Sequence, residues 1–167
     1  MIAKVDADAE NGKATAREQG VSGYPTIKFF PKGSTESVPY EGARSEQAFI
    51  DFLNEKTGTH RTVGGGLDTK AGTIASLDEL IASTSAADLA AAVKKAAAEL
   101  KDKYAQYYVK VADKLSQNAE YATKELARLE KILAKGGSAP EKVDDLISRS
   151  NILRKFVGEE KEAKDEL

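Results

Sequence analysis

Ten residues decide the fold of the first part of this chain: Val21-Ser22-Gly23-Tyr24-Pro25-Thr26-Ile27-Lys28-Phe29-Phe30. Their second half, Thr26–Phe30, is β-branched and aromatic, which favours a β-strand. A proline directly before a buried strand removes a hydrogen-bond donor, so the backbone there needs a special geometry. A cis peptide bond at Tyr24-Pro25 would supply it. An ordinary turn proline is the alternative interpretation.

Strands and helices alternate around this stretch. We predict strands at Ile2–Asp6 and Glu36–Tyr40, and helices at Asn11–Gln19 and Glu46–Lys56. Gly20 is expected to end the first helix. Pro39 is typical of an edge strand, because it cannot donate to a neighbour. Ser45 is the predicted N-cap of the second helix. These elements indicate a small unit of mixed α and β structure.

The composition changes near residue 66, after three consecutive glycines, Gly64-Gly65-Gly66. Such a run predicts a flexible linker, because glycine is the costliest residue to hold in one conformation. The chain beyond it is rich in Ala, Leu, Lys and Glu, which predicts an all-helical part. The expected helices are 77–83, 86–101, 103–115, 119–134 and 139–157. Leu126, Leu129, Ile132 and Leu133 share one face, as do Val143, Leu146, Ile147 and Leu153, which indicates one helical bundle.

Three pairs of residues have the spacing of a capping box, in which a serine is followed three residues later by an acid. The pairs are Ser76 with Glu79, Ser85 with Asp88, and Ser138 with Glu141. Each serine is therefore predicted to begin a helix.

Bulk properties exclude several classes of function. The chain has 167 residues, a formal net charge of −2 and no cysteine. The charge gives no electrostatic footprint for nucleic acid or an anionic membrane. No apolar run reaches the roughly 20 residues of a membrane span, and no signal peptide is visible at the start. His60 is the single histidine, and no catalytic residue, metal site or cofactor is expected.

The first part resembles the thioredoxin-fold domains of the protein disulfide-isomerase family. The resemblance runs from about Ile2 to Thr57 and includes Tyr24-Pro25 and the Tyr40–Arg44 turn. It implies that the loop of Tyr24, Pro25 and Thr26 holds substrate peptide. In that family a Cys-x-x-Cys pair lies before the matched region, so only the second half of the domain is expected here. Without a thiolate the chain has no nucleophile for disulfide exchange.

The last four residues, Lys164-Asp165-Glu166-Leu167, match the retrieval signal of the endoplasmic reticulum lumen. A charged tail without this role is the alternative. The signal predicts residence in that lumen and recognition by the retrieval receptor.

The helical part, from about Ser76 to Val157, resembles the all-helical D domain of the Windbeutel type. The resemblance implies a module that binds chaperones and unfolded polypeptides of the endoplasmic reticulum. Tyr104, Tyr107 and Tyr108 lie on one side of a predicted helix. They are expected either as core residues or, on the sharper interpretation, as an exposed aromatic contact for a partner.

These observations predict an α+β half thioredoxin fold joined to an all-α bundle of about five helices. The predicted divisions are 1–58 for the half domain, 59–75 for the linker, 76–157 for the D domain and 158–167 for the tail. The predicted function is non-catalytic binding of clients or partners. The alternative is thiol-disulfide exchange, inherited in name from a longer parent protein. Ile2–Asp6 is expected to pair directly with Thr26–Phe30, and the open sheet edge could support self-association.

Overall fold

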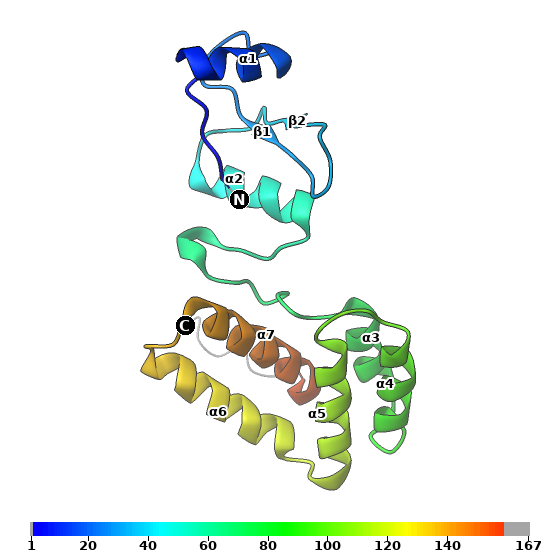
Figure 1. Cartoon of the computed structure of the whole chain (residues 1–167). Helices are drawn as coiled ribbons and strands as arrows, with labels where there is room; N and C mark the ends of the chain where they lie inside the picture. The colour runs from blue at the N-terminus through cyan, green and yellow to red at the C-terminus, as the bar shows by residue number, and fades with distance from the viewer. Residues whose placement is uncertain (1, 159–167) are drawn as a thin grey trace. The chain divides into compact units, whose positions relative to one another are not determined.

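The computed structural model describes residues 2–158, and it divides between Thr57 and Gly58 into two compact units. The first unit contains two helices and a small sheet, and the second is all-helical (Figure 1). This architecture confirms the predicted class, an α+β unit joined to a helical bundle.

The sheet of the first unit consists of β1 (Lys28–Phe29) and β2 (Val38–Pro39). The two strands are antiparallel and pair Lys28 with Pro39 and Phe29 with Val38. The Tyr40 amide extends the ladder by donating to the Ile27 carbonyl at 2.9 Å. Both strands lie inside the predicted ranges but are shorter, because few neighbouring groups continue the pairing.

Aromatic side chains join the sheet to α2 (Glu46–Thr57). Phe29 meets Phe52 edge to face, with ring centroids 5.9 Å apart. Tyr40 contacts Phe49 at 4.8 Å and Phe52 at 4.9 Å. Ser45 caps the helix as predicted, since its hydroxyl accepts from the Ala48 amide at 3.2 Å.

The segment Ile2–Asp6 is not a strand, which corrects the expectation that it would pair with Thr26–Phe30. Instead, the Asp6 carboxylate accepts hydrogen bonds from the amides of Asp8 and Ala9, just before α1 (Glu10–Glu18). This local bonding satisfies the backbone at the entry to the helix and competes with strand pairing. Ile2 is 91% exposed as a result.

The first unit has a very small core. Within residues 2–57, only Gly12 and Ala16 are buried. Several large apolar side chains of this unit are exposed: Ile2, Val5, Tyr24, Phe30, Val38 and Leu53. So little apolar burial indicates a unit of low intrinsic stability.

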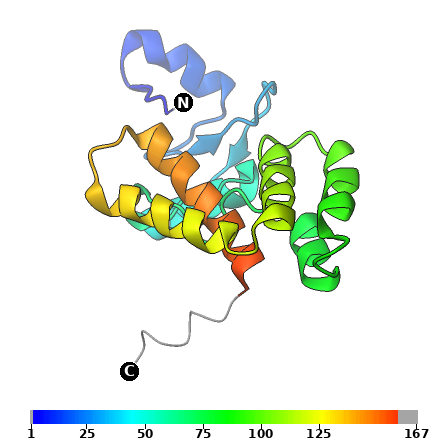
Figure 2. The ribbon, with the colours of Figure 1, turned by 90° about the horizontal axis from the view of Figure 1, so that it is seen from below.

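The second unit contains five helices among its described residues, as predicted. They are α3 (Ala75–Ser83), α4 (Leu89–Ala98), α5 (Ala105–Gln117), α6 (Tyr121–Lys135) and α7 (Pro140–Val157). Figures 1 and 2 both show α6 and α7 side by side. Their shared core includes Leu129 and Leu153, which are 2% and 0% exposed.

The predicted capping boxes are largely wrong. The N-caps of α3 and α7 are Ile74 and Ala139, one or two residues away from the predicted caps, and neither uses a side-chain cap. Ser85 does bond Asp88, but between side chains at 2.8 Å, and α4 begins only after Asp88.

The glycine-rich segment also differs from the flexible linker expected over residues 59–75. It belongs to the helical unit and contains a short 3₁₀ turn, η1 (Val63–Gly65). Gly64 and Gly65 have φ angles of 80° and 85°. Glycine is the residue that adopts such positive φ angles without steric cost, so the backbone geometry accounts for glycine at these two positions. An antiparallel bridge pairs Arg61 with Leu67 across the turn.

Candidate functional site

The cis-proline loop, defined as Gly23–Thr26, connects α1 to β1. The Tyr24-Pro25 peptide bond is cis, as the sequence predicted. Tyr24, Pro25 and Thr26 are all exposed, and the Tyr24 side chain is 69% exposed. The loop therefore presents an aromatic ring and a fixed backbone turn to solvent.

Hydrogen bonds hold both ends of this loop. Within it, the Thr26 hydroxyl donates to the Gly23 carbonyl at 2.7 Å. Beyond it, the Lys28 ammonium donates to the Gln19 carbonyl at the end of α1. The loop is thus anchored to the helix before it and the strand after it, so its shape is set before any ligand arrives.

Thiol chemistry has no side chain to support it in this chain, because a thiolate is the nucleophile of disulfide exchange. The sequence contains no cysteine. His60 lies beside Asp68, with Nδ1 and Oδ2 3.2 Å apart. The Asp68 amide also donates a backbone hydrogen bond to the His60 carbonyl. No group of three or more His, Cys, Asp or Glu residues that could hold a metal occurs within residues 2–158.

The three tyrosines singled out in the sequence are buried. Tyr104, Tyr107 and Tyr108 are 7%, 9% and 0% exposed, at the start of α5 and within it. The burial corrects the interpretation of an exposed aromatic contact and favours the alternative, a role in the core. The reason is that α5 packs against α4, α6 and α7, so three of its faces are covered.

Tyr108 fixes the start of α3. Its hydroxyl donates to the Asp78 carboxylate at 2.5 Å and accepts from the Ile74 amide at 3.0 Å. Burial raises the pKa of Tyr108 far above its usual value, and the Asp78 bond adds to this. Burial also raises the pKa of Asp78, against the opposing effects of the Tyr108 bond and Lys155. A tertiary contact thus replaces the local cap predicted at Ser76.

Tyr107 has a different environment. Its hydroxyl is buried and has no hydrogen-bond partner among the described residues. The Arg149 guanidinium lies 5.1 Å from the centroid of its ring. Burial, followed by the negative charge of Glu125, raises the pKa of Tyr107. The side chain therefore contributes packing and a cation–π contact rather than a hydrogen bond.

A shallow apolar groove lies between α3 and α4. Leu80, Ala92 and Ala96 line it, with Lys95 and Glu99 at its border. Sequence reasoning missed this feature. The signal that could have found it is the pair Ala92 and Ala96, which share one helix face and leave room above it.

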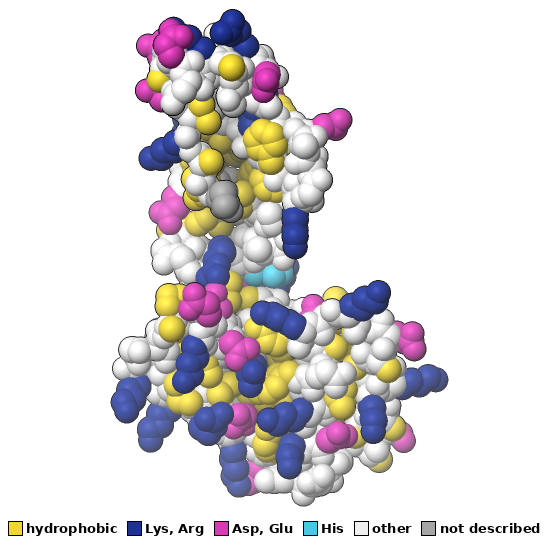
Figure 3. Space-filling view, in the orientation of Figure 1, with side chains coloured by type: hydrophobic (Ala, Val, Ile, Leu, Met, Phe, Trp, Pro, Cys, Tyr) yellow, Lys and Arg dark blue, Asp and Glu magenta, His cyan; other side chains and the backbone are white. Residues whose placement is uncertain are grey.

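The visible face of the helical unit mixes charges with apolar side chains. Figure 3 shows Lys and Arg interspersed with Asp and Glu over this face. Within residues 2–158, no helix combines the length and apolar character that crossing a membrane requires.

Each of the two units matches a known protein-family model. Residues 72–156 match the family model described as endoplasmic reticulum protein ERp29, C-terminal domain. Residues 1–55 match the thioredoxin model. The chain is 98% identical, over its whole length, to protein disulfide-isomerase tigA of Aspergillus niger, and covers 46% of that protein. The chain belongs to the family described as endoplasmic reticulum protein ERp29, C-terminal domain, and along its length it is similar to protein disulfide-isomerases.

Two further members of the disulfide-isomerase family extend the comparison. Protein disulfide-isomerase erp38 of Neurospora crassa is 60% identical over 99% of this chain. Protein disulfide isomerase-like 2-2 of Oryza sativa subsp. japonica is 39% identical over 93% of it. The chain spans about half the length of these relatives, 47% and 44%.

The structure describes one of the two remaining predicted sites, the cis-proline loop, but not the other, the retrieval signal. The cis-proline loop is where the sequence predicted it, and its backbone geometry is as expected. The predicted retrieval signal, Lys164–Leu167, lies outside the described residues.

Proposed function

We propose that this chain is a non-catalytic, polypeptide-binding part of a disulfide isomerase of the endoplasmic reticulum lumen. The observation that carries the proposal is the exposed, anchored cis-proline loop in a chain without cysteine. Tyr24 offers a large apolar ring at low entropic cost, which suits contact with an unfolded segment. Phe30 and Val38, 46% and 38% exposed, add apolar surface in the same unit.

Two observations support the luminal location. The matching family model is described as that of an endoplasmic reticulum protein. The sequence contains Lys164-Asp165-Glu166-Leu167, which matches a luminal retrieval signal.

The helical unit is proposed to bind partners, both chaperones and partly folded polypeptides. The groove of Leu80, Ala92 and Ala96 supports this role, because it leaves apolar surface open next to charges that can orient a partner. The short sheet adds a second route, self-association through an open strand edge.

Replacing Tyr24→Ala is expected to weaken binding of an unfolded polypeptide about 5–10-fold, the loss typical of an exposed aromatic anchor. The probe is carboxymethylated α-lactalbumin carrying a fluorophore, and the measurement is fluorescence anisotropy with the full chain. Tyr24→Phe should retain most of the affinity, because the ring remains.

The matched control for this experiment is Val63→Ala, which removes an exposed apolar side chain from the other unit. Val63 is 50% exposed. Equal losses from Tyr24→Ala and Val63→Ala would show non-specific apolar adhesion and contradict a site at the loop. Unchanged affinity in Tyr24→Ala would do the same.

The chain by itself is expected to show no disulfide reduction, oxidation or isomerisation, because thiol-disulfide exchange needs a thiolate. The assays are reduction of insulin and reactivation of scrambled ribonuclease. A cysteine-containing disulfide isomerase serves as the positive control. Turnover above the buffer rate would refute the non-catalytic assignment and favour the alternative function.

A further inference from the structure

Residues His60–Thr73 form an ordered strap on the helical unit. The strap doubles back on itself, since the Asp68 amide donates to the His60 carbonyl at 3.0 Å and Arg61 pairs with Leu67. Gly64 and Gly65, both at positive φ, turn the chain between the two arms. Gly64 and Gly65 therefore shape a turn that other residues would strain.

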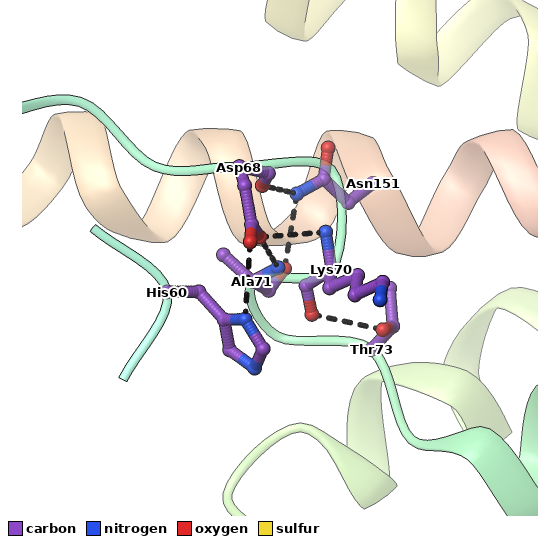
Figure 4. Close-up of polar contacts among 6 residues, drawn as sticks. All are labelled: His60, Asp68, Lys70, Ala71, Thr73 and Asn151. Atoms are coloured by element: carbon purple, nitrogen blue, oxygen red, sulfur yellow. Dashed lines mark hydrogen bonds and ion pairs between the residues drawn. The ribbon is translucent and has the colours of Figure 1, made fainter. Parts of the chain in front are cut away.

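Asp68 holds the second arm of the strap, as Figure 4 shows. One oxygen of its carboxylate accepts from the amides of Lys70 and Ala71, at 2.8 and 3.0 Å. The other oxygen contacts the His60 ring at 3.2 Å. One side chain thus connects both arms to each other.

Asn151 of α7 fixes the strap to the bundle. Its amide nitrogen donates to the carbonyls of Asp68 and Ala71, at 2.9 and 3.0 Å, as seen in Figure 4. Asn151 is 3% exposed, and its amide oxygen accepts from Arg154. Asn151 therefore fixes the strap to α7 specifically, because replacing it with an apolar residue would leave the carbonyls of Asp68 and Ala71 without this donor.

Two further contacts bring the strap against α7. At Gly72, a Cβ atom would lie 2.5 Å from the Cβ of Ser148, so only glycine allows this approach. Arg61 binds the Asp144 carboxylate with both terminal nitrogens, one of them at 2.9 Å. The strap is therefore bound to α7 near Asp144, Ser148 and Asn151, along two turns of the helix.

We propose that the strap is a releasable clamp that sets how far the two units can move apart. While it is docked, only Gly58 and Thr59 lie between the end of α2 and the strap, a reach of about 7 Å when extended. If it is released, the whole segment between α2 and α3 becomes a tether of roughly 55 Å. Two of its contacts, His60 with Asp68 and Arg61 with Asp144, are partly exposed, whereas Asn151 is buried. Partly exposed polar contacts open before a buried core does, so we expect release to begin at these two pairs.

Limited trypsin digestion tests the docked state, because trypsin cleaves after Arg61 and Lys70 within the strap. In the native full chain, cleavage after Lys70 is expected to be at least about tenfold slower than in a free peptide of residues 58–75, since a protease needs an extended segment. Asn151→Ala should remove most of this protection. Asp144→Asn should expose the site after Arg61 while leaving the buried Asn151 contacts in place.

The matched control is Ser150→Ala, which also removes a buried hydrogen bond from α7 but not from the strap. The Ser150 hydroxyl donates to the Leu146 carbonyl of its own helix. Equal cleavage rates in Asn151→Ala and Ser150→Ala, both folded by circular dichroism, would overturn the proposal. Cleavage of the parent chain as fast as the free peptide would overturn it as well.

The effect on reach is tested with two spin labels, which attach specifically because the chain has no cysteine of its own. Glu55→Cys places one label on α2, and Lys131→Cys places the other on α6. The distribution of distances between the labels is expected to broaden and extend at least about 1.5-fold in Asn151→Ala, in line with the longer tether. Identical distributions in the parent, Asn151→Ala and Ser150→Ala backgrounds would refute the clamp.

Discussion

A fragment of residues 76–158 is expected to be less stable than a fragment of residues 59–158 by about 2–4 kcal/mol. The longer fragment retains the strap, whereas the shorter one begins at the boundary that the sequence suggested. Without the strap, Asn151 loses two acceptors, at Asp68 and Ala71, and remains in a buried position. The Ile74 amide also disappears as the donor to Tyr108. Urea denaturation followed by circular dichroism measures the difference.

The control for this comparison is the chain of residues 2–158. Because the two units are separate compact units, its helical transition should match that of the 59–158 fragment. Equal stability of the 59–158 and 76–158 fragments would mean that the strap contributes nothing to the folded bundle.

The helices of the second unit were predictable because their signal is local. Leu126, Leu129, Ile132 and Leu133 repeat at helical spacing, and Leu129 is indeed buried while its neighbours pack around the core. Such periodicity arises whenever one face of a helix is covered, whichever element covers it. The bundle could therefore be predicted without knowing its topology.

The buried polar residues of α7 could not be predicted in this way. Ser148, Ser150 and Asn151 are 4%, 1% and 3% exposed, yet by type they belong to a solvated face. Ser148 and Asn151 pack against the strap, which lies about 80 residues earlier in the sequence. Likewise, three glycines indicate a flexible linker unless the partner of the turn is known.

The candidate site likewise has features that local sequence predicts and features that depend on distant contacts. The cis-proline geometry followed from one proline and the strand after it, so it was visible in the sequence. The role of the tyrosines depended on which helices surround α5, so the sequence left it open. The position of Ile2–Asp6 was mispredicted because local hydrogen bonds to the Asp6 carboxylate outweighed pairing with a strand only two residues long.

Removing the Tyr108 hydroxyl, by Tyr108→Phe, is expected to destabilise the helical unit by about 2 kcal/mol. The change leaves the Ile74 amide without its acceptor and the half-buried Asp78 carboxylate without its donor. Chemical denaturation of the full chain, read from the helical transition, provides the measurement.

Tyr107→Phe is the matched control, because the Tyr107 hydroxyl is buried without a partner among the described residues. Removing it abolishes a polar group that makes no hydrogen bond there, so the stability should stay unchanged or rise. Similar losses in both variants would contradict the capping role, because they would trace the effect to aromatic packing alone.

The pH dependence of Tyr108→Phe separates the two bonds that the hydroxyl makes. Burial holds the pKa of Asp78 above its usual value in the folded chain, and the bond from Tyr108 opposes that shift by stabilising the carboxylate. Without the hydroxyl the folded-state pKa of Asp78 rises further, so the variant favours protonated Asp78 more strongly. The destabilisation should then be greatest at neutral pH, where Asp78 is charged, and shrink as the pH falls through its folded-state pKa. The part that persists at low pH comes from bonds that do not need the Asp78 charge, among them the bond from the Ile74 amide. A loss that does not vary with pH would contradict a role for the charged Asp78 carboxylate.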